Sequence, residues 1–235
     1  YIVGDRIEFI QYNLKKQIAK ALKGCEKCND LSYDEVMEKS EKLVYEFLSK
    51  IPSIRDYLAT DVVAAFNGDP AAYSTDEIIL CYPGFFAITV YRVAHELWKL
   101  KIPMIPRVLS EYAHGLTGID IHPGATIGKY FFIDHGTGVV IGETSVIGEY
   151  VRIYQAVTLG AKRFELNDDG ALKKDYARHP IVEDHVVIYA GATILGRITI
   201  GRGSIIGGNV WLTHSVAAGS QILQSPSESL HNSKV

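Results

Sequence analysis

The first half of the chain repeats its apolar residues every three or four positions. A clear run comprises Ile7, Ile10, Leu14, Ile18 and Leu22. This spacing places apolar side chains on one face of a helix. Breaks at Gly24, Pro52, residues 68–70 and Pro83 divide the region into five or six helices of ordinary length. The pattern predicts an all-helical N-terminal domain over residues 1–117.

In the second half, an aliphatic residue returns at every sixth position. The series runs through Ile121, Ile127, Ile133, Ile141, Ile147, Ile153, Leu159, Val182, Ile188, Ile194, Ile200, Ile206 and Leu212. It slips by two residues after Ile133, and the polar residues 161–180 interrupt it. Only four of the 21 glycines precede residue 115. A period of six fits a solenoid with three short strands per coil, in which aliphatic residues point inward and glycines serve the turns.

These two patterns predict an α+β multidomain chain. A solenoid of a little over four coils is expected over residues 118–220, with residues 161–180 leaving it as a loop and residues 221–235 forming a tail. Long polar loops on rigid frames commonly carry function. A narrow apolar prism of this kind is usually completed by oligomerisation.

Composition excludes several classes of function. The chain has 24 Lys and Arg against 27 Asp and Glu, without a run of basic residues, so a nucleic-acid partner is not expected. Apolar stretches are shorter than the ~18 residues that a membrane span needs. Three cysteines and a start without a leader pattern favour a soluble, cytoplasmic protein without disulfides.

One histidine stands out as candidate chemistry. His135 lies in the slipped segment, between Asp134 and Gly136, where its side chain projects at a turn. Asp120 lies 15 residues upstream, so we expect it approximately one coil away. A carboxylate beside an imidazole fixes its tautomer and raises its basicity. The pair is therefore a candidate general base with an orienting acid.

Several motifs occur in the order typical of one family. They are Asp69-Pro70, Asp120-Ile121-His122-Pro123, Asp134-His135-Gly136-Thr137-Gly138, Val140-Ile141-Gly142-Glu143-Thr144, Val157-Thr158-Leu159-Gly160 and Arg178-His179-Pro180. On these motifs the chain resembles the serine acetyltransferases, from about residue 60 to residue 218. The resemblance implies a left-handed parallel β-helix after a helical domain.

The resemblance also implies roles for individual residues. His135 would take the proton from the hydroxyl of L-serine as it attacks acetyl-CoA, and Asp120 would hold the imidazole. Asp69 and Asp134 would bind the substrate ammonium group. Arg178 would pair with the substrate carboxylate, and His179 would line the same pocket.

For coenzyme A, the family uses the outside of the prism between neighbouring subunits. The matching positions are Gly160, Ala161, Lys162, Ala190 and Gly208. The loop after Gly160 departs from the family, because Ala161 replaces a second glycine and the loop is longer and more charged. Lys162, Arg163 or the Lys173-Lys174 pair are candidates for phosphate contact.

The resemblance further implies a homotrimer or a hexamer, feedback inhibition by L-cysteine and no metal. Association with O-acetylserine sulfhydrylase is a weaker expectation, since the chain ends at Val235 where the family has a terminal isoleucine. Three alternatives remain. They are a hexapeptide acetyltransferase with a sugar or antibiotic acceptor, a metal lyase of the γ-carbonic anhydrase type using His135, His179 and His185, and a non-catalytic trimeric scaffold.

Overall fold

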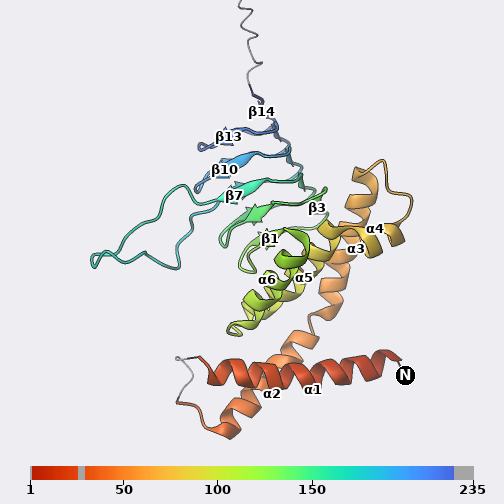
Figure 1. Ribbon diagram of the computed structural model, residues 1–235, viewed down its shortest axis with the longest axis vertical. Coiled ribbons are helices and arrows are strands. Elements are labelled where there is room, and N and C mark those ends of the chain that lie inside the picture. Colours follow the sequence, from red (N-terminus) through yellow and green to blue (C-terminus); the bar gives the residue numbers. More distant parts are fainter. Residues whose placement is uncertain (1, 26–29, 225–235) are drawn as a thin grey trace, which may run out of the picture.

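The computed structural model describes residues 2–25 and 30–224, and it begins with six helices (Figure 1). They are α1 (Ile2–Lys23), α2 (Tyr33–Leu48), α3 (Ile51–Gly68), α4 (Thr75–Cys81), α5 (Pro83–Lys99) and α6 (Ile105–Thr117). The predicted helical region is confirmed. In Figure 1, α1 and α2 lie at one end of the molecule, and α3 leads from them to the strands.

Local sequence sets the ends of these helices. The hydroxyl of Ser32 accepts a hydrogen bond from the backbone N–H of Glu35, whose carboxylate accepts one from the N–H of Ser32, a reciprocal cap that starts α2. Prolines occupy the first turn of α3, α5 and α6, where a missing N–H costs nothing. Gly118 ends α6 with a φ of +70°, a left-handed conformation that favours glycine.

Fourteen short strands follow in the described part of the chain. They are β1 (Asp120–Ile121), β2 (Thr126–Ile127), β3 (Phe132–Ile133), β4 (Val140–Ile141), β5 (Val146–Ile147), β6 (Arg152–Ile153), β7 (Thr158–Gly160), β8 (Ile181–Val182), β9 (Val187–Ile188), β10 (Thr193–Leu195), β11 (Thr199–Ile200), β12 (Ile205–Ile206), β13 (Trp211–Leu212) and β14 (Gln221–Ile222). Their ladders are all parallel and form three sheets, in the orders β1-β4-β7-β10-β13 (sheet A), β11-β8-β5-β2 (sheet B) and β14-β12-β9-β6-β3 (sheet C). The chain therefore climbs a three-sided prism of parallel coils, as the six-residue period predicts.

Strand register explains both irregularities of the repeat. Ile121 pairs with Ile141, twenty residues on, whereas Ile141 pairs with Leu159 after eighteen. The two extra residues of the first coil fall in the turn that holds His135, whose φ of +57° lies in the left-handed region. Asp120 pairs with Val140, directly after this turn, so Asp120 lies about one coil below the turn that holds His135, in agreement with the expected separation. The two-residue slip of the repeat therefore lies within the first coil, between β3 and β4.

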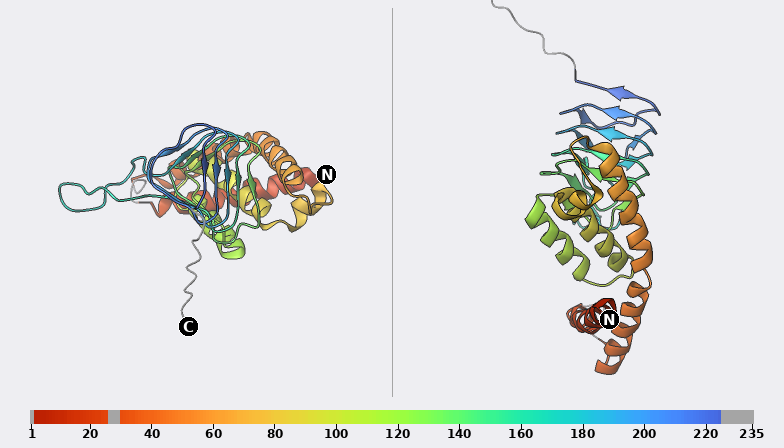
Figure 2. Two further views of the ribbon diagram at one scale, coloured as in Figure 1. Left: turned by 90° about the horizontal axis from the view of Figure 1, so that it is seen from above. Right: turned by 90° about the vertical axis from the view of Figure 1, so that its right-hand side faces the viewer.

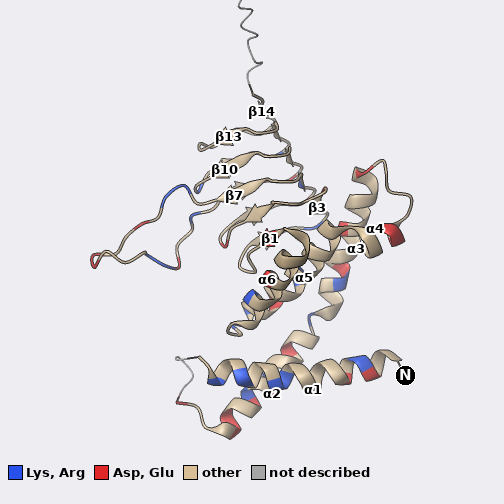
Figure 3. Cartoon of the chain, in the orientation of Figure 1, with Lys and Arg blue, Asp and Glu red and all other residues tan. Residues whose placement is uncertain are grey.

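The long insertion stands away from the prism. β7 ends at Gly160 and β8 begins at Ile181, and the intervening residues 161–180 project as an arm (Figures 1 and 2). A bridge between Leu166 and Leu172 makes its outer part a hairpin. The arm and the helices carry charges of both signs, whereas the prism carries few (Figure 3). At the other end, β14 extends the coils to Ile222, two residues into the expected tail, and residues 225–235 lie outside the described part.

The prism core is a column of buried aliphatic side chains, one from each side of each coil. Ile141, Ile147, Ile153 and Leu159 are at most 2% exposed. A buried ion pair joins the helices to the base of this column. Arg92 on α5 donates to both carboxylate oxygens of Asp61 on α3 and to the backbone carbonyl oxygens of Ile127 and Gly128. The helical domain is thus fixed against the first coil.

Among the described residues, no single helix is long and apolar enough to cross a membrane. Helices α4 and α5 pass such a test only when joined, and they are bent by 74° where they meet.

Candidate functional site

The predicted site residues lie on two different edges of the prism. The first edge, formed by the turns from sheet C to sheet A, carries His135, Gln155, Ala190 and Gly208 on successive coils. The second edge, formed by the turns from sheet A to sheet B, carries Gly160 to Lys162 and Arg178-His179. One chain therefore separates its predicted ammonium-binding and carboxylate-binding residues by a full face of the prism.

Asp69 lies beside the first edge, in the loop after α3. Its Oδ2 accepts a hydrogen bond from the hydroxyl of Tyr82 at 2.6 Å, and its Oδ1 accepts one from the backbone N–H of Ala71 at 2.8 Å. The pKa of Asp69 is lowered by the Tyr82 hydroxyl first and by Ala71 next, with smaller contributions from Arg152 and His135. Asp69 is therefore held as a carboxylate near His135.

Asp134 occupies the outer face of sheet C next to His135. Its Oδ2 accepts a hydrogen bond from Nη2 of Arg152, and its Oδ1 lies 3.7 Å from Nε2 of His135. The side chain of Asp134 is 11% exposed, whereas that of His135 is 73% exposed. The structure thus brings together Asp69, Asp134 and His135 and adds a guanidinium that the sequence analysis missed.

Arg178 and His179 are organised by Thr144 on the second edge. The hydroxyl oxygen of Thr144 accepts hydrogen bonds from the backbone N–H groups of both residues, and Nδ1 of His179 accepts one from the N–H of Thr144 at 3.1 Å. Burial first, and then the charge of Arg178, lowers the pKa of His179 to about 4. His179 is therefore neutral near pH 7. Arg178 is held by the carboxylate of Glu143.

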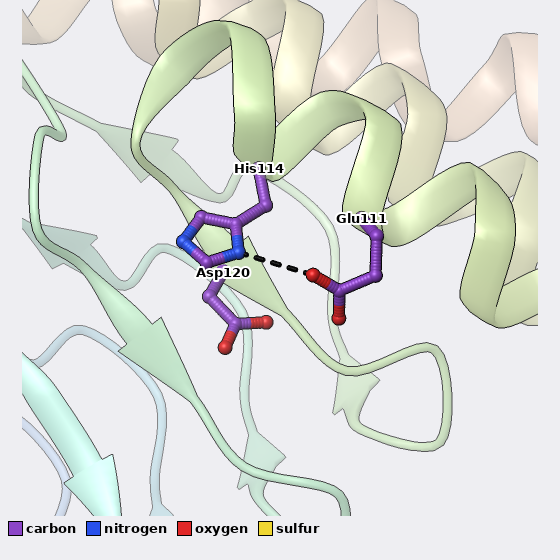
Figure 4. Close-up of side chains that lie close together, drawn as sticks. All are labelled: Glu111, His114 and Asp120. Atoms are coloured by element: carbon purple, nitrogen blue, oxygen red, sulfur yellow. Dashed lines mark hydrogen bonds and ion pairs between the residues drawn. The ribbon is translucent and has the colours of Figure 1, made fainter.

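Asp120 faces helix α6 (Figure 4). The ligand atoms of Glu111, His114 and Asp120 all lie within 4.8 Å of one another, and Nδ1 of His114 is 3.3 Å from Oε2 of Glu111. Within the described residues, no ion pair joins Asp120 to His135. The three side chains could hold a cation by distance, yet Glu111 is already paired with Arg107.

The three histidines considered for a metal lyase do not converge in one chain. His135 lies on the first edge, His179 on the second, and His185 on the turn from sheet B to sheet C, where its ring stacks on Tyr150. The residues expected to contact coenzyme A are also divided. Ala190 and Gly208 continue the edge of His135, and Gly160, Ala161 and Lys162 lie at the root of the arm.

The sequence analysis missed Tyr82, Thr144 and Arg152 as site residues. A signal for Arg152 was present, because the outward position before each inward aliphatic residue is charged only at Asp120 and Arg152. Tyr82 lies in the helical half, far along the chain from the motifs, and no periodicity marks it.

The prism and its edge residues define a hexapeptide-repeat transferase. The family model described as "Bacterial transferase hexapeptide (six repeats)" matches residues 179–214. A plasmid serine acetyltransferase of Synechococcus elongatus is 62% identical over 80% of this chain, which spans 59% of that relative. The serine acetyltransferase of Bacillus licheniformis is 47% identical, with 72% of this chain and 74% of the relative covered. The chain belongs to the serine acetyltransferase family.

Solved structures of the same family are similar across both domains. Isoform 3 of the Entamoeba histolytica serine acetyltransferase, in complex with cysteine, matches with a TM-score of 0.80 and 39% identity over 98% of this chain and 74% of that one. The Brucella abortus enzyme, in complex with coenzyme A, matches with a TM-score of 0.69 and 31% identity over 92% and 80%.

Proposed function

We propose that this chain is a serine O-acetyltransferase, which transfers the acetyl group of acetyl-CoA to the hydroxyl of L-serine in the first step of cysteine biosynthesis. The observation that carries the proposal is the exposed imidazole of His135 beside the carboxylates of Asp69 and Asp134. Two carboxylates beside a projecting base suit a substrate that offers an ammonium group and a hydroxyl. A scaffold without catalysis has no use for such an arrangement.

In this reaction His135 removes the hydroxyl proton of serine as the oxygen attacks the thioester carbonyl, and it returns that proton to the departing thiolate of CoA. Asp120 stabilises the imidazolium form from β1, one coil below the turn that holds His135. The attack is direct and needs no acyl-enzyme. Proximity and orientation supply roughly 7–11 kcal/mol of such a barrier reduction, so small displacements of these groups should be costly.

The separation of the two edges supports a site shared between subunits. Asp69 and Asp134 hold the ammonium group on the first edge of one chain. Arg178 and His179 on the second edge of another copy then hold the carboxylate, which matches the planar fork of arginine. We propose a homotrimer around the prism, with a left-handed coil as in the family.

Coenzyme A is proposed to run along the first edge above His135. Ala190 and Gly208 are small there, and a Cβ on Gly208 would meet the carbonyl oxygen of Ala190 at 3.2 Å. The other side of this coenzyme A site is proposed to come from the neighbouring copy, through Gly160, Ala161 and Lys162. Lys162, at the root of the arm, is placed to neutralise a phosphate.

Other partners follow from the family. L-cysteine is proposed as a feedback inhibitor, since it shares the ammonium and carboxylate groups of serine. Apolar residues stay exposed on α1, including Val3 and Phe9, which supports pairing of trimers into a hexamer. Free Cys25 and Cys81 and the use of acetyl-CoA support a cytoplasmic location. Association with O-acetylserine sulfhydrylase concerns the tail, residues 221–235, of which residues 225–235 lie outside the described part.

The test of the activity is thiol release from acetyl-CoA with L-serine as acceptor, for the natural chain and for His135→Ala. Serine-dependent release that the variant loses is expected. Homoserine and a panel of sugars and antibiotics serve as rival acceptors. If thiol is released with one of these acceptors and not with serine, the chain is a hexapeptide acetyltransferase with a different acceptor.

The test of the shared site is complementation. His135→Ala and His179→Asn are each expected to be inactive, and a random mixture of the two unfolded and refolded together should recover up to about one quarter of the natural activity, because that share of junctions has both residues intact. A mixture as inactive as its components would place the whole site within one chain.

A further inference from the structure

Arg152 binds the carboxylate that lies beside the proposed base, His135. It is the outward residue of β6, in register with Phe132 on β3 below. Its guanidinium lies 5.0 Å from the ring centre of Phe132 and 4.6 Å from that of Tyr154. Cation–π contacts of this kind attract a guanidinium to the faces of aromatic rings. Arg152 is therefore packed in place, with its side chain 26% exposed.

From that position Arg152 reaches Asp134. Nη2 donates to Oδ2 of Asp134, and the other oxygen of the same carboxylate faces Nε2 of His135 at 3.7 Å. The three side chains form a line from a fixed cation, through a nearly buried carboxylate, to an exposed imidazole. Asp69 belongs to the same group of charges, since the charges of Arg152 and His135 both contribute to lowering its pKa.

The charges in this cluster come from every element around His135. The loop after α3 contributes Asp69, the start of α5 contributes Tyr82, and the turn itself contributes Asp134. β6 and the residue after it contribute Arg152 and Tyr154, whereas Asp120 on β1 faces α6 and is not counted in this cluster. Near the ammonium position, two carboxylates and one guanidinium leave one net negative charge. Without Arg152 there would be two.

We infer that Arg152 is a positioning residue that fixes the carboxylate of Asp134 beside His135 and cancels one negative charge of the ammonium site. The inference rests on the proposed serine acetyltransferase activity. A single net negative charge matches one substrate ammonium group. Without Arg152, the uncompensated carboxylate of Asp134 would favour the imidazolium form of His135, which cannot accept a proton.

Arg152→Met tests this inference. We expect kcat to fall roughly tenfold with a smaller change in the KM for serine, and the acid limb of the kcat profile to move up by roughly one pH unit. Arg152→Lys keeps the charge and loses the planar fork, so it should restore the position of the acid limb and only part of kcat. Arg55→Met, an exposed arginine on α3, is the matched control and should change neither. If Arg152→Met does not fold, Arg152→Gln takes its place with the same expected shift.

A double-mutant cycle with Asp134→Asn shows whether Arg152 acts through Asp134. In the Asp134→Asn background, Arg152→Met should have little further effect on kcat. Additive losses, or a limb that stays in place in Arg152→Met, would overturn the inference.

A direct titration separates this inference from the activity itself. The ring signal of His135, identified by its loss in His135→Ala, is followed by NMR against pH in the natural chain and in Arg152→Met. An upward shift of the midpoint supports the inference even if serine is not the acceptor. An unchanged midpoint rejects it even if serine is acetylated.

Discussion

The hydroxyl of Tyr82 donates a 2.6 Å hydrogen bond to Oδ2 of Asp69, across thirteen residues of the chain. Asp69 in turn raises the pKa of Tyr82 to about 12, so the hydroxyl stays protonated and keeps donating through the neutral range. This bond fixes one of the two carboxylates proposed to receive the substrate ammonium group. It joins the loop after α3 to the start of α5.

Tyr82→Phe is expected to raise the KM for serine roughly two- to tenfold, which corresponds to about 0.5–1.5 kcal/mol for one typical hydrogen bond, with little change in kcat. Loss of the donor also raises the pKa of Asp69, so the effect should be larger at acid pH than at neutral pH. Steady-state kinetics at several pH values measure both. Tyr73→Phe, at a fully exposed tyrosine in the same region, is the control, and equal kinetics in the two variants would argue against the role of Tyr82.

Gly142→Ala should abolish most activity without unfolding the chain. A Cβ at this position would lie 2.0 Å from Cδ2 of His179, and the ring would have to leave its place. We expect kcat/KM to fall at least tenfold while the circular dichroism spectrum stays unchanged. Gly115→Ala has open space around it and is the matched control. Retained activity in Gly142→Ala would show that His179 is not needed where the structure places it.

Stability should decrease in mild acid because two histidines are held neutral. Burial is the main cause that lowers the pKa of His122 and of His179 to about 4, against an ordinary value of 6.5. Between these values the unfolded chain binds protons that the folded chain does not. The free energy of unfolding is therefore highest, as far as these two histidines are concerned, above pH 6.5, and it decreases as the pH falls to about 4.

Urea unfolding between pH 7.5 and 4 measures this loss. The double variant His122→Gln, His179→Gln should show a shallower decline than the natural chain. His214→Gln, at an exposed histidine, should decline as the natural chain does. Parallel curves for all three proteins would contradict the prediction.

Asp61→Ala should destabilise the fold strongly. Asp61 and Arg92 are 1% and 6% exposed, and removal of the carboxylate leaves a buried guanidinium without its counter-charge. We expect a loss of about 3–5 kcal/mol in the free energy of unfolding, measured by urea at a fixed protein concentration. Asp56→Ala, on the exposed side of α3, should cost less than 1 kcal/mol, roughly as other surface substitutions do. A similar small loss for Asp61→Ala would mean that the ion pair contributes little.

Lys162→Met should raise the KM for acetyl-CoA roughly three- to tenfold and leave the KM for serine unchanged. Lys162 is exposed at the root of the arm, so its attraction to a phosphate should weaken with added salt. Kinetics at low and high ionic strength check this. Lys39→Met on α2 is the control, and a salt-independent KM would remove Lys162 from the cofactor site.

The sequence determined the two-domain plan. The three- and four-residue spacing required helices, and the six-residue period required coils of three strands, since only that geometry returns each aliphatic residue to one interior column. The two-residue slip already marked the turn that projects His135. These are local, periodic properties, so they can be read from each residue and its neighbours along the sequence.

Tertiary structure alone decided which residues meet. The bond between Tyr82 and Asp69, and the placement of Arg152 behind Asp134, depend on how α3 and α5 lie against sheet C, and no periodicity encodes that contact. The strand order also places Arg178 and His179 one face of the prism away from His135. The six-residue spacing alone does not show which edge of the prism a given turn occupies, because that depends on which strands pair. The site of one chain is therefore divided by geometry that its motifs do not reveal.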